Sequence, residues 1–144
     1  MNFEPRDPDY ERRVRESFAR QRAMATLGAR LVRVAPGEVE VALAFDEALT
    51  QQHGYVHAGV VAAAADTACG YAALTLADAG SEVLSIEFKL NLLSPAAGES
   101  FVARARVLRA GRNVTVCAGD VFAAQGGAEK LVATMLATMM RVGA

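Results

Sequence analysis

The sequence has little of what metal sites, disulfide frameworks and nucleic-acid surfaces need. It contains two cysteines, Cys69 and Cys117, and two histidines, and their spacing matches no metal-binding motif. We therefore expect two reduced, buried thiols and no metal. A net charge of −1 provides neither an electrostatic field for nucleic acid nor a basic stripe for a membrane surface.

The chain also lacks segments that would divide it or direct it elsewhere. It has no internal repeats, linkers or low-complexity stretches, and 144 residues suit one domain, residues 1–144, with a real core. Residues 1–7 are charged and no apolar run follows, so we expect a cytoplasmic protein without a signal peptide. Residues 56–79 are long enough to span a bilayer, but they contain His57, Asp66 and Asp78, which favours a buried helix.

The patterns that are present predict an α+β fold. Residues 9–25 have the spacing of an amphipathic surface helix. Two strands joined at Pro36-Gly37 follow, and an alanine-rich segment from about 58 to about 77 predicts a long buried helix. Four hairpin-connected strands come next, the first with Leu84, Ile86, Phe88, Leu90 and Leu92 alternating with polar residues. We expect an antiparallel sheet of about six strands wrapped around one central helix.

Asp66 is the unusual residue of the long helix. Its neighbours at helical spacing are all small, so the carboxylate has room beside it rather than a polar face: Ala62, Ala63, Cys69, Gly70 and Ala73. A buried carboxylate is costly without a partner or a task, and such groups concentrate at functional sites. Alternatively, Asp66 is structural, caps a neighbouring loop or reaches water at a subunit edge.

The start of the same helix can stabilise negative charge. If the helix begins near Ala58, its free N–H groups and positive dipole end can hold a carbonyl oxygen, and Gly59 lets that carbonyl approach closely. Ala58 and Asp66 are separated by roughly 12 Å along the axis. Because a carboxylate must come within about 3–3.5 Å of the carbonyl it acts on, we predict composite sites at a twofold dimer interface. Two antiparallel helices would each offer the helix start to the other's Asp66.

Four motifs together resemble the hotdog-fold acyl-CoA thioesterases of the phenylacetate-degradation (PaaI-like) type: Gly54-x-x-His57-x-Gly59, Asp66-Thr67-Ala68, Leu90-Asn91-Leu92-Leu93-Ser94-Pro95 and Arg109-x-Gly111-Arg112. The resemblance covers residues 24–140. It implies a hotdog fold, a homodimer often paired into a tetramer, and metal-free hydrolysis of an acyl-CoA. Coenzyme A would be part of the substrate, and no cofactor would be retained.

The resemblance also implies roles for single residues. Asp66 would be the nucleophile or general base, the Ala58 N–H the oxyanion donor, and Gln51 the amide that orients the carbonyl or the attacking water. The family commonly has Asn and Gly where this chain has Gln51 and Ala58, which affects substrate range and rate more than reaction class. Ser85 lies near where family members often place a second polar residue.

Four other positions keep two interpretations. His57 either contacts the thioester or fixes the turn through a ring nitrogen that bonds a backbone carbonyl. Arg109 and Arg112 either hold coenzyme A phosphates or belong to a solvated turn. Asn91 either binds substrate or forms local hydrogen bonds on a strand face.

The leading hypothesis is thus an acyl-CoA thioesterase. The alternative is a non-catalytic acyl-CoA-binding hotdog protein, which would bind the thioester without releasing thiol. A hydratase or dehydratase ranks last, because no histidine follows Asp66 in the chain. The sequence does not identify the acyl group, although Tyr55, Tyr71 and Leu74 could shape its pocket.

Overall fold

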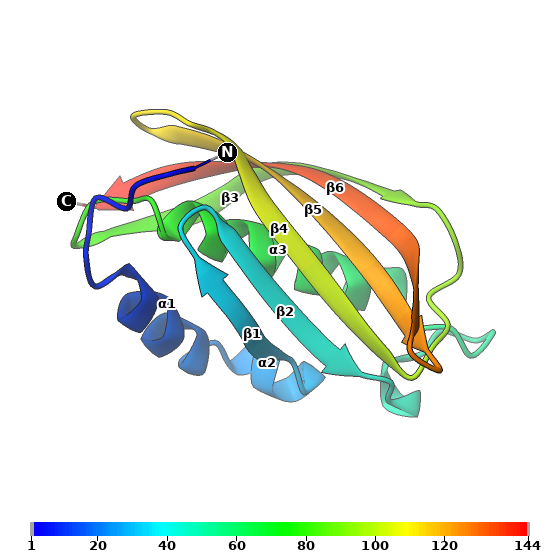
Figure 1. Cartoon of the computed structure of the whole chain (residues 1–144). Coiled ribbons are helices and arrows are strands. Elements are labelled where there is room, and N and C mark those ends of the chain that lie inside the picture. The colour runs from blue at the N-terminus through cyan, green and yellow to red at the C-terminus, as the bar shows by residue number, and fades with distance from the viewer. Residues whose placement is uncertain (1, 144) are drawn as a thin grey trace.

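The computed structural model describes residues 2–143 and confirms the predicted architecture. Six antiparallel strands in the order β1-β2-β4-β5-β6-β3 form a curved sheet, and helix α3 lies against its concave side (Figure 1). The strands are β1 (Arg30–Ala35), β2 (Glu38–Ala44), β3 (Ser81–Leu92), β4 (Ser100–Ala110), β5 (Val114–Gln125) and β6 (Ala128–Gly143). A short 3-10 helix, η1 (Glu47–Leu49), precedes the loop that leads into α3.

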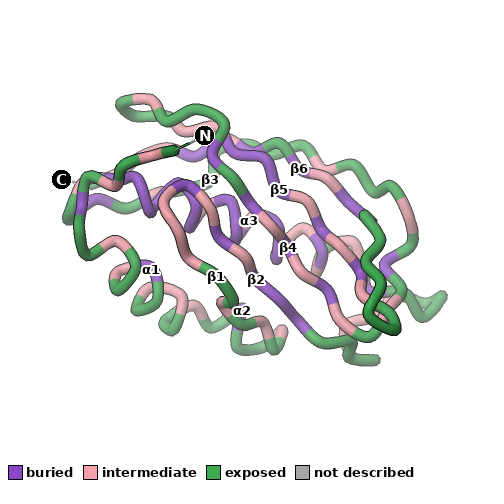
Figure 2. Tube along the Cα trace, in the orientation of Figure 1, coloured by how far each residue is buried: buried purple, intermediate pink, exposed green. Residues whose placement is uncertain are grey.

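Helix α3 (Ala58–Leu74) is the centre of the core (Figure 2). Its alanines let the sheet come close, and Ala65, Ala68 and Ala72 are completely buried. The helix ends three residues earlier than expected. The reason is a tightened last turn in which Thr75 Oγ1 donates to Ala72 O (2.6 Å) and accepts from Gly37 N (2.8 Å).

The N-terminal segment forms hydrogen bonds at the C-terminal end of α3. Arg13 on helix α1 (Tyr10–Ala19) donates to the carbonyl oxygens of Leu74, Ala77 and Asp78 at 3.1, 2.9 and 2.7 Å. Leu74 is the last residue of α3, and Ala77 and Asp78 lie in the turn that follows it. One guanidinium therefore ties the N-terminal helix to the central one.

The helix expected over residues 9–25 is divided into two, α1 and α2 (Arg22–Leu27). The break comes at Gln21, whose backbone is extended (φ −81°, ψ 97°). Its side chain instead forms hydrogen bonds to Tyr71 and Thr67 on α3. Tertiary hydrogen bonds thus interrupt a segment whose local pattern would continue the helix.

Strand β3 contains a bulge at Ile86 that changes which side chains face α3. Ser85 is opposite Met139 and Glu87 is opposite Thr138, so Ile86 has no partner in the ladder. Directly opposed residues share a face, which places Ser85 and Phe88 on the α3 side with buried Met139 and Ala137. The uniform alternation expected from Leu84 to Leu92 is therefore wrong: the bulge re-aims Ser85 toward the helix.

The two edges of the sheet differ. Helix α1 lies beside β1, whereas β3 forms the other edge (Figure 1). Exposed hydrophobic side chains lie along β3, where Leu84, Ile86 and Phe88 are 60%, 55% and 45% exposed. Within residues 2–143, no helix is long and apolar enough to cross a bilayer.

Candidate functional site

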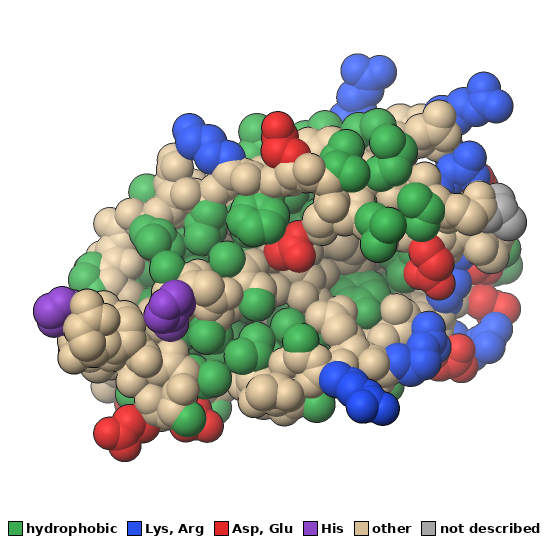
Figure 3. All heavy atoms as spheres, turned by 180° about the vertical axis from the view of Figure 1, so that it is seen from behind, with side chains coloured by type: hydrophobic (Ala, Val, Ile, Leu, Met, Phe, Trp, Pro, Cys, Tyr) green, Lys and Arg blue, Asp and Glu red, His purple; other side chains and the backbone are tan. Residues whose placement is uncertain are grey.

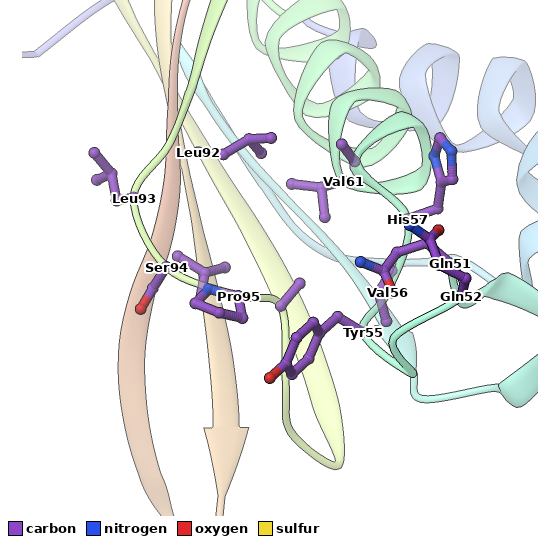
Figure 4. Close-up of a pocket in the computed structure, with 13 residues that line it drawn as sticks. Gln51, Gln52, Tyr55, Val56, His57, Val61, Leu92, Leu93, Ser94 and Pro95 are labelled. Carbon is purple, nitrogen blue, oxygen red and sulfur yellow. The ribbon is translucent and has the colours of Figure 1, made fainter.

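A cavity of about 480 Å³ opens at the start of α3. One wall is the loop from Gln51 to His57 together with Ala58, and the other is the segment that links β3 to β4 (Figure 4). Tyr55, Leu92 and Pro95 make much of the lining apolar. The cavity therefore places a hydrophobic surface next to the positive end of the helix.

His57 is the N-cap of α3. Its Nδ1 accepts a hydrogen bond from the Gly59 N–H at 2.8 Å, and a Cβ at position 59 would lie only 3.0 Å from that nitrogen. Gly59 is thus needed for the ring to close over the helix start. The Ala58 N–H, by contrast, has no acceptor among the described residues, so it is the free donor of this turn.

Gln51 lies at the rim of the same cavity. Its side-chain Oε1 accepts from the His53 N–H at 2.5 Å, and its backbone N–H donates to Tyr55 O at 2.8 Å. These bonds fix the loop and leave the amide NH₂ as the group that can donate to a ligand.

Asp66 is half-buried in the middle of α3 and is held by Ser85. The Ser85 hydroxyl donates to Asp66 Oδ1 at 2.6 Å and also lies 3.3 Å from Met139 Sδ. Asp66 Oδ2 has no hydrogen-bond partner within residues 2–143. One oxygen is therefore fixed and the other is free, and Asp66 lines a second cavity, of about 210 Å³.

The two cavities share no lining residue. Ala58 and Asp66 are separated by about 12 Å along the helix, as expected from their eight-residue spacing. The protomer therefore holds a free backbone N–H and a free carboxylate oxygen at separate places. The face of α3 away from the sheet is hollowed, with hydrophobic side chains around the hollow and most Lys and Arg side chains toward the rim (Figure 3).

The other predicted positions lie apart from these two cavities. Arg112 lines a third cavity, of about 220 Å³, near the C-terminal end of α3, together with Arg6 and Arg141. Arg109 and Asn91 are exposed and line none of the three. Asn91 is opposite Thr134, one step out of phase with the α3-facing pair Leu90 and Met135, so it points to the outer face.

Sequence reasoning missed the polar group beside Asp66. Gln21 donates through Nε2 to Tyr71 Oη (3.2 Å), Ser17 Oγ lies 3.1 Å from the same hydroxyl, and Thr67 Oγ1 donates to Gln21 Oε1 (3.3 Å). Gln21 falls on the otherwise apolar stripe of residues 9–25. A polar residue on that stripe was the available signal.

The two thiols are buried and free, as expected. Burial raises the pKa of Cys69 above the range of ordinary thiols and raises the pKa of Cys117 to about 12. Since the thiolate is the reactive form, neither cysteine is a nucleophile at neutral pH. Within residues 2–143, no group of three or more His, Cys, Asp or Glu side chains could hold a metal ion.

Comparison with known proteins identifies the family. The model of the Thioesterase superfamily matches residues 53–130, more than half of the chain. The crystal structure of a thioesterase family protein from Silicibacter pomeroyi is 50% identical, covers 94% of this chain and 99% of its own, and superposes with a TM-score of 0.92. A phenylacetic acid degradation-related protein from Ralstonia eutropha is 28% identical over 91% of this chain and 98% of its own, with a TM-score of 0.78.

A curated relative is more distant. A Saccharolobus solfataricus protein named "Putative esterase" is 33% identical over 90 residues, which are 62% of this chain and 64% of the relative. The chain thus spans slightly less than two thirds of that relative's length. The family match, the similar solved structures and the sheet wrapped around α3 agree: the protein belongs to the Thioesterase superfamily, as a hotdog-fold member of the PaaI-like type.

Proposed function

We propose that the protein hydrolyses acyl-CoA thioesters to a free acid and coenzyme A. The observation that carries this proposal is the pairing of Asp66 with Ser85, which fixes Oδ1 and leaves Oδ2 free on a residue that lines a cavity, in a chain of the Thioesterase superfamily. A carboxylate with one oxygen fixed and the other open is oriented for attack or for proton abstraction.

Two routes use the same residues. Asp66 Oδ2 either attacks the thioester carbonyl, giving a mixed anhydride that water then hydrolyses, or removes a proton from a water that attacks directly. In both routes the carbonyl oxygen gains negative charge, which the Ala58 N–H and the α3 dipole stabilise by a few kcal/mol. The C–S bond then breaks, and the thiolate of coenzyme A leaves and takes up a proton. The Gln51 amide orients the carbonyl or the water.

The active unit proposed is a homodimer. The Ala58 N–H and Asp66 of one protomer are too far apart for one carbonyl, so the helix start must come from a partner whose α3 runs antiparallel. The exposed β3 edge supports this assembly. Its unpaired backbone groups are a template for another strand, and its exposed Leu84, Ile86 and Phe88 would be covered by a twofold contact. Two such dimers could pair into a tetramer.

Coenzyme A recognition is assigned to the basic cavity at the C-terminal end of α3. Arg112 lies there with Arg6 and Arg141, and guanidinium groups suit phosphate geometry. Arg109, at the same hairpin, is a candidate for an outer phosphate contact. The proposed location is the cytoplasm, where unpaired thiols such as Cys69 and Cys117 stay reduced.

The direct test is thiol release from a panel of acyl-CoA thioesters. Asp66→Asn should lower kcat by about 10³-fold or more, because it removes the base or nucleophile, while thermal unfolding and dimer size stay unchanged. Ser85→Ala should lower kcat by about 10-fold, the effect of an unfixed carboxylate. Glu129→Gln, on the outer end of β6, is the matched carboxylate-to-amide control.

Two results would count against the proposal. If Asp66→Asn keeps near-normal turnover, Asp66 is not in the mechanism. If the wild-type protein binds acyl-CoA tightly and releases no thiol, the protein is a binding module instead.

A further inference from the structure

The cavity beside Asp66 has a wall that α3 does not supply. Ser17 on α1 and Gln21 between α1 and α2 line it next to Tyr71 and Thr67, to which they are hydrogen-bonded, while Leu74 and Gly70 line it from α3. The N-terminal helices therefore close the space next to the proposed catalytic carboxylate. At about 210 Å³ the cavity is smaller than the roughly 300–1,000 Å³ of typical small-molecule sites.

Hydrogen bonds hold this wall in a fixed orientation. Thr67 donates to Gln21 Oε1, so Gln21 Nε2 donates to Tyr71 Oη, which acts as an acceptor in that bond. The Tyr71 O–H proton can then point to Ser17 Oγ, 3.1 Å away, or to a ligand. Phe18 packs against the Tyr71 ring with centroids 5.9 Å apart, which keeps the hydroxyl in place.

Gly70 provides the volume of the cavity. Its backbone is helical, without positive φ, so conformation does not require glycine. A Cβ built at this position meets no atom within 4 Å, so packing within the protomer does not require it either. Glycine inside a helix is less stable than alanine. The chain therefore carries a destabilising residue one turn from Asp66, and what the residue supplies is empty space.

We infer that this cavity is the acyl pocket, and that it selects compact acyl groups whose far end carries a hydrogen-bonding group. The inference rests on the proposed thioesterase function, since it places the acyl chain beside Asp66. Gly70 sets the space available, and Tyr71 Oη, held by Gln21 and Ser17, is the contact for the distal polar group. An apolar tail cannot accept a hydrogen bond from the Tyr71 O–H, which then keeps Ser17 as its acceptor, so such a tail gains less from this pocket than one with a distal oxygen.

The test compares three thioesters of graded size and polarity: acetyl-CoA, hexanoyl-CoA and 6-hydroxyhexanoyl-CoA. The wild-type protein should prefer the hydroxylated six-carbon chain over the plain one by about 3- to 10-fold in kcat/KM. Tyr71→Phe keeps the ring and removes the hydroxyl, so it should abolish that preference. Gly70→Leu fills the cavity and should lower kcat/KM for both six-carbon substrates by about 10-fold or more, and by a larger factor than for acetyl-CoA.

Binding measurements keep the inference testable without turnover. Calorimetry with the non-hydrolysable thioethers S-ethyl-CoA, S-hexyl-CoA and S-(6-hydroxyhexyl)-CoA should show the same order of affinities. If no substrate releases thiol while these affinities follow the predicted order, the proposed hydrolysis is wrong and the pocket assignment is supported. If Tyr71→Phe leaves the six-carbon preference unchanged, or Gly70→Leu weakens all three ligands equally, the pocket assignment is overturned.

Fold and assembly are checked on the same variants. Gly70→Ala, the milder substitution, should raise the midpoint of thermal unfolding by about 1–4 °C while it lowers kcat/KM for the six-carbon substrates. Light scattering should show that Gly70→Ala and Gly70→Leu keep the oligomeric state of the wild type. If either one dissociates it, the space beside Gly70 belongs to a partner protomer, which overturns the inference.

Discussion

The orientation of Asp66 and the availability of the Ala58 N–H each depend on one hydrogen bond made by another residue. Asp66 is conspicuous in the sequence because it is the one acid in an alanine-rich helix, but its orientation comes from Ser85, which the bulge at Ile86 turns toward α3. Ala58 offers its N–H because His57 caps the next one. Neither the bulge nor the cap has a sequence pattern specific enough to predict it.

His57 can be tested as a cap. His57→Ala should lower the free energy of unfolding by about 1 kcal/mol, because Gly59 N–H loses its acceptor, and His57→Asn should restore most of the loss. Urea unfolding of the three proteins measures this, with kcat/KM recorded in parallel. Should His57→Asn restore stability but not activity, the ring itself contacts the substrate.

The cysteines give a prediction about pH. Both thiols have a folded pKa raised by burial, so thiolate is scarce in the native protein at pH 8 and Ellman's reagent should react with neither Cys69 nor Cys117 until the protein is denatured. The unfolded state loses the thiol proton above about pH 9 and the folded state does not, so these thiols should make stability fall as pH rises past 9. Rapid labelling of the native protein at pH 8 would contradict the buried placement.

At the scale of elements, the position of α3 depends on how closely the sheet approaches it. Gly119 on β5 lies directly under the helix, where an added Cβ would come 2.9 Å from Cys69 Sγ and 3.6 Å from Ala65 O. The thiol occupies the space that a side chain at position 119 would need. Glycine on the strand and cysteine on the helix therefore form a matched pair.

Gly119→Ala should lower the free energy of unfolding by about 1–3 kcal/mol, because the buried Sγ must move in a packed core. Cys69→Ala in the same chain removes that atom and should recover much of the loss. Cys69→Ala alone is the control, and a double-mutant cycle by urea unfolding gives the coupling between the two sites. Additive losses would show that the two residues do not share this space.

The elements themselves were largely predictable, and the exceptions have physical reasons. Alternating and apolar runs separated by turn signals such as Pro36-Gly37 predicted the six strands, and the run of alanines predicted α3. The break at Gln21 could not be predicted because glutamine is a good helix former. The hydrogen bonds that favour the extended backbone there are made with Tyr71 and Thr67, which are distant in the sequence. The bulge at Ile86 could not be predicted because isoleucine is favourable at any strand position.

At the scale of the whole molecule, the proposed reaction needs a partner protomer. Eight residues along one helix separate the Ala58 N–H from the Asp66 carboxylate, and the structure places them at two cavities without shared residues. That separation was predictable from helix geometry alone, because 1.5 Å per residue is fixed by the backbone. What the sequence did not reveal is that β3 carries exposed hydrophobic side chains both before and after its bulge.

Subunit complementation tests this central claim most directly. Asp66→Asn removes the carboxylate, and Ala58→Pro removes the donor N–H at a helix position where proline is tolerated, so each variant alone should be inactive. When the two are denatured and refolded together in equal amounts, half of the dimers are mixed and each mixed dimer has one complete composite site. Thiol release should then return to about a quarter of the wild-type rate. A mixture as inactive as its two components would contradict the shared site.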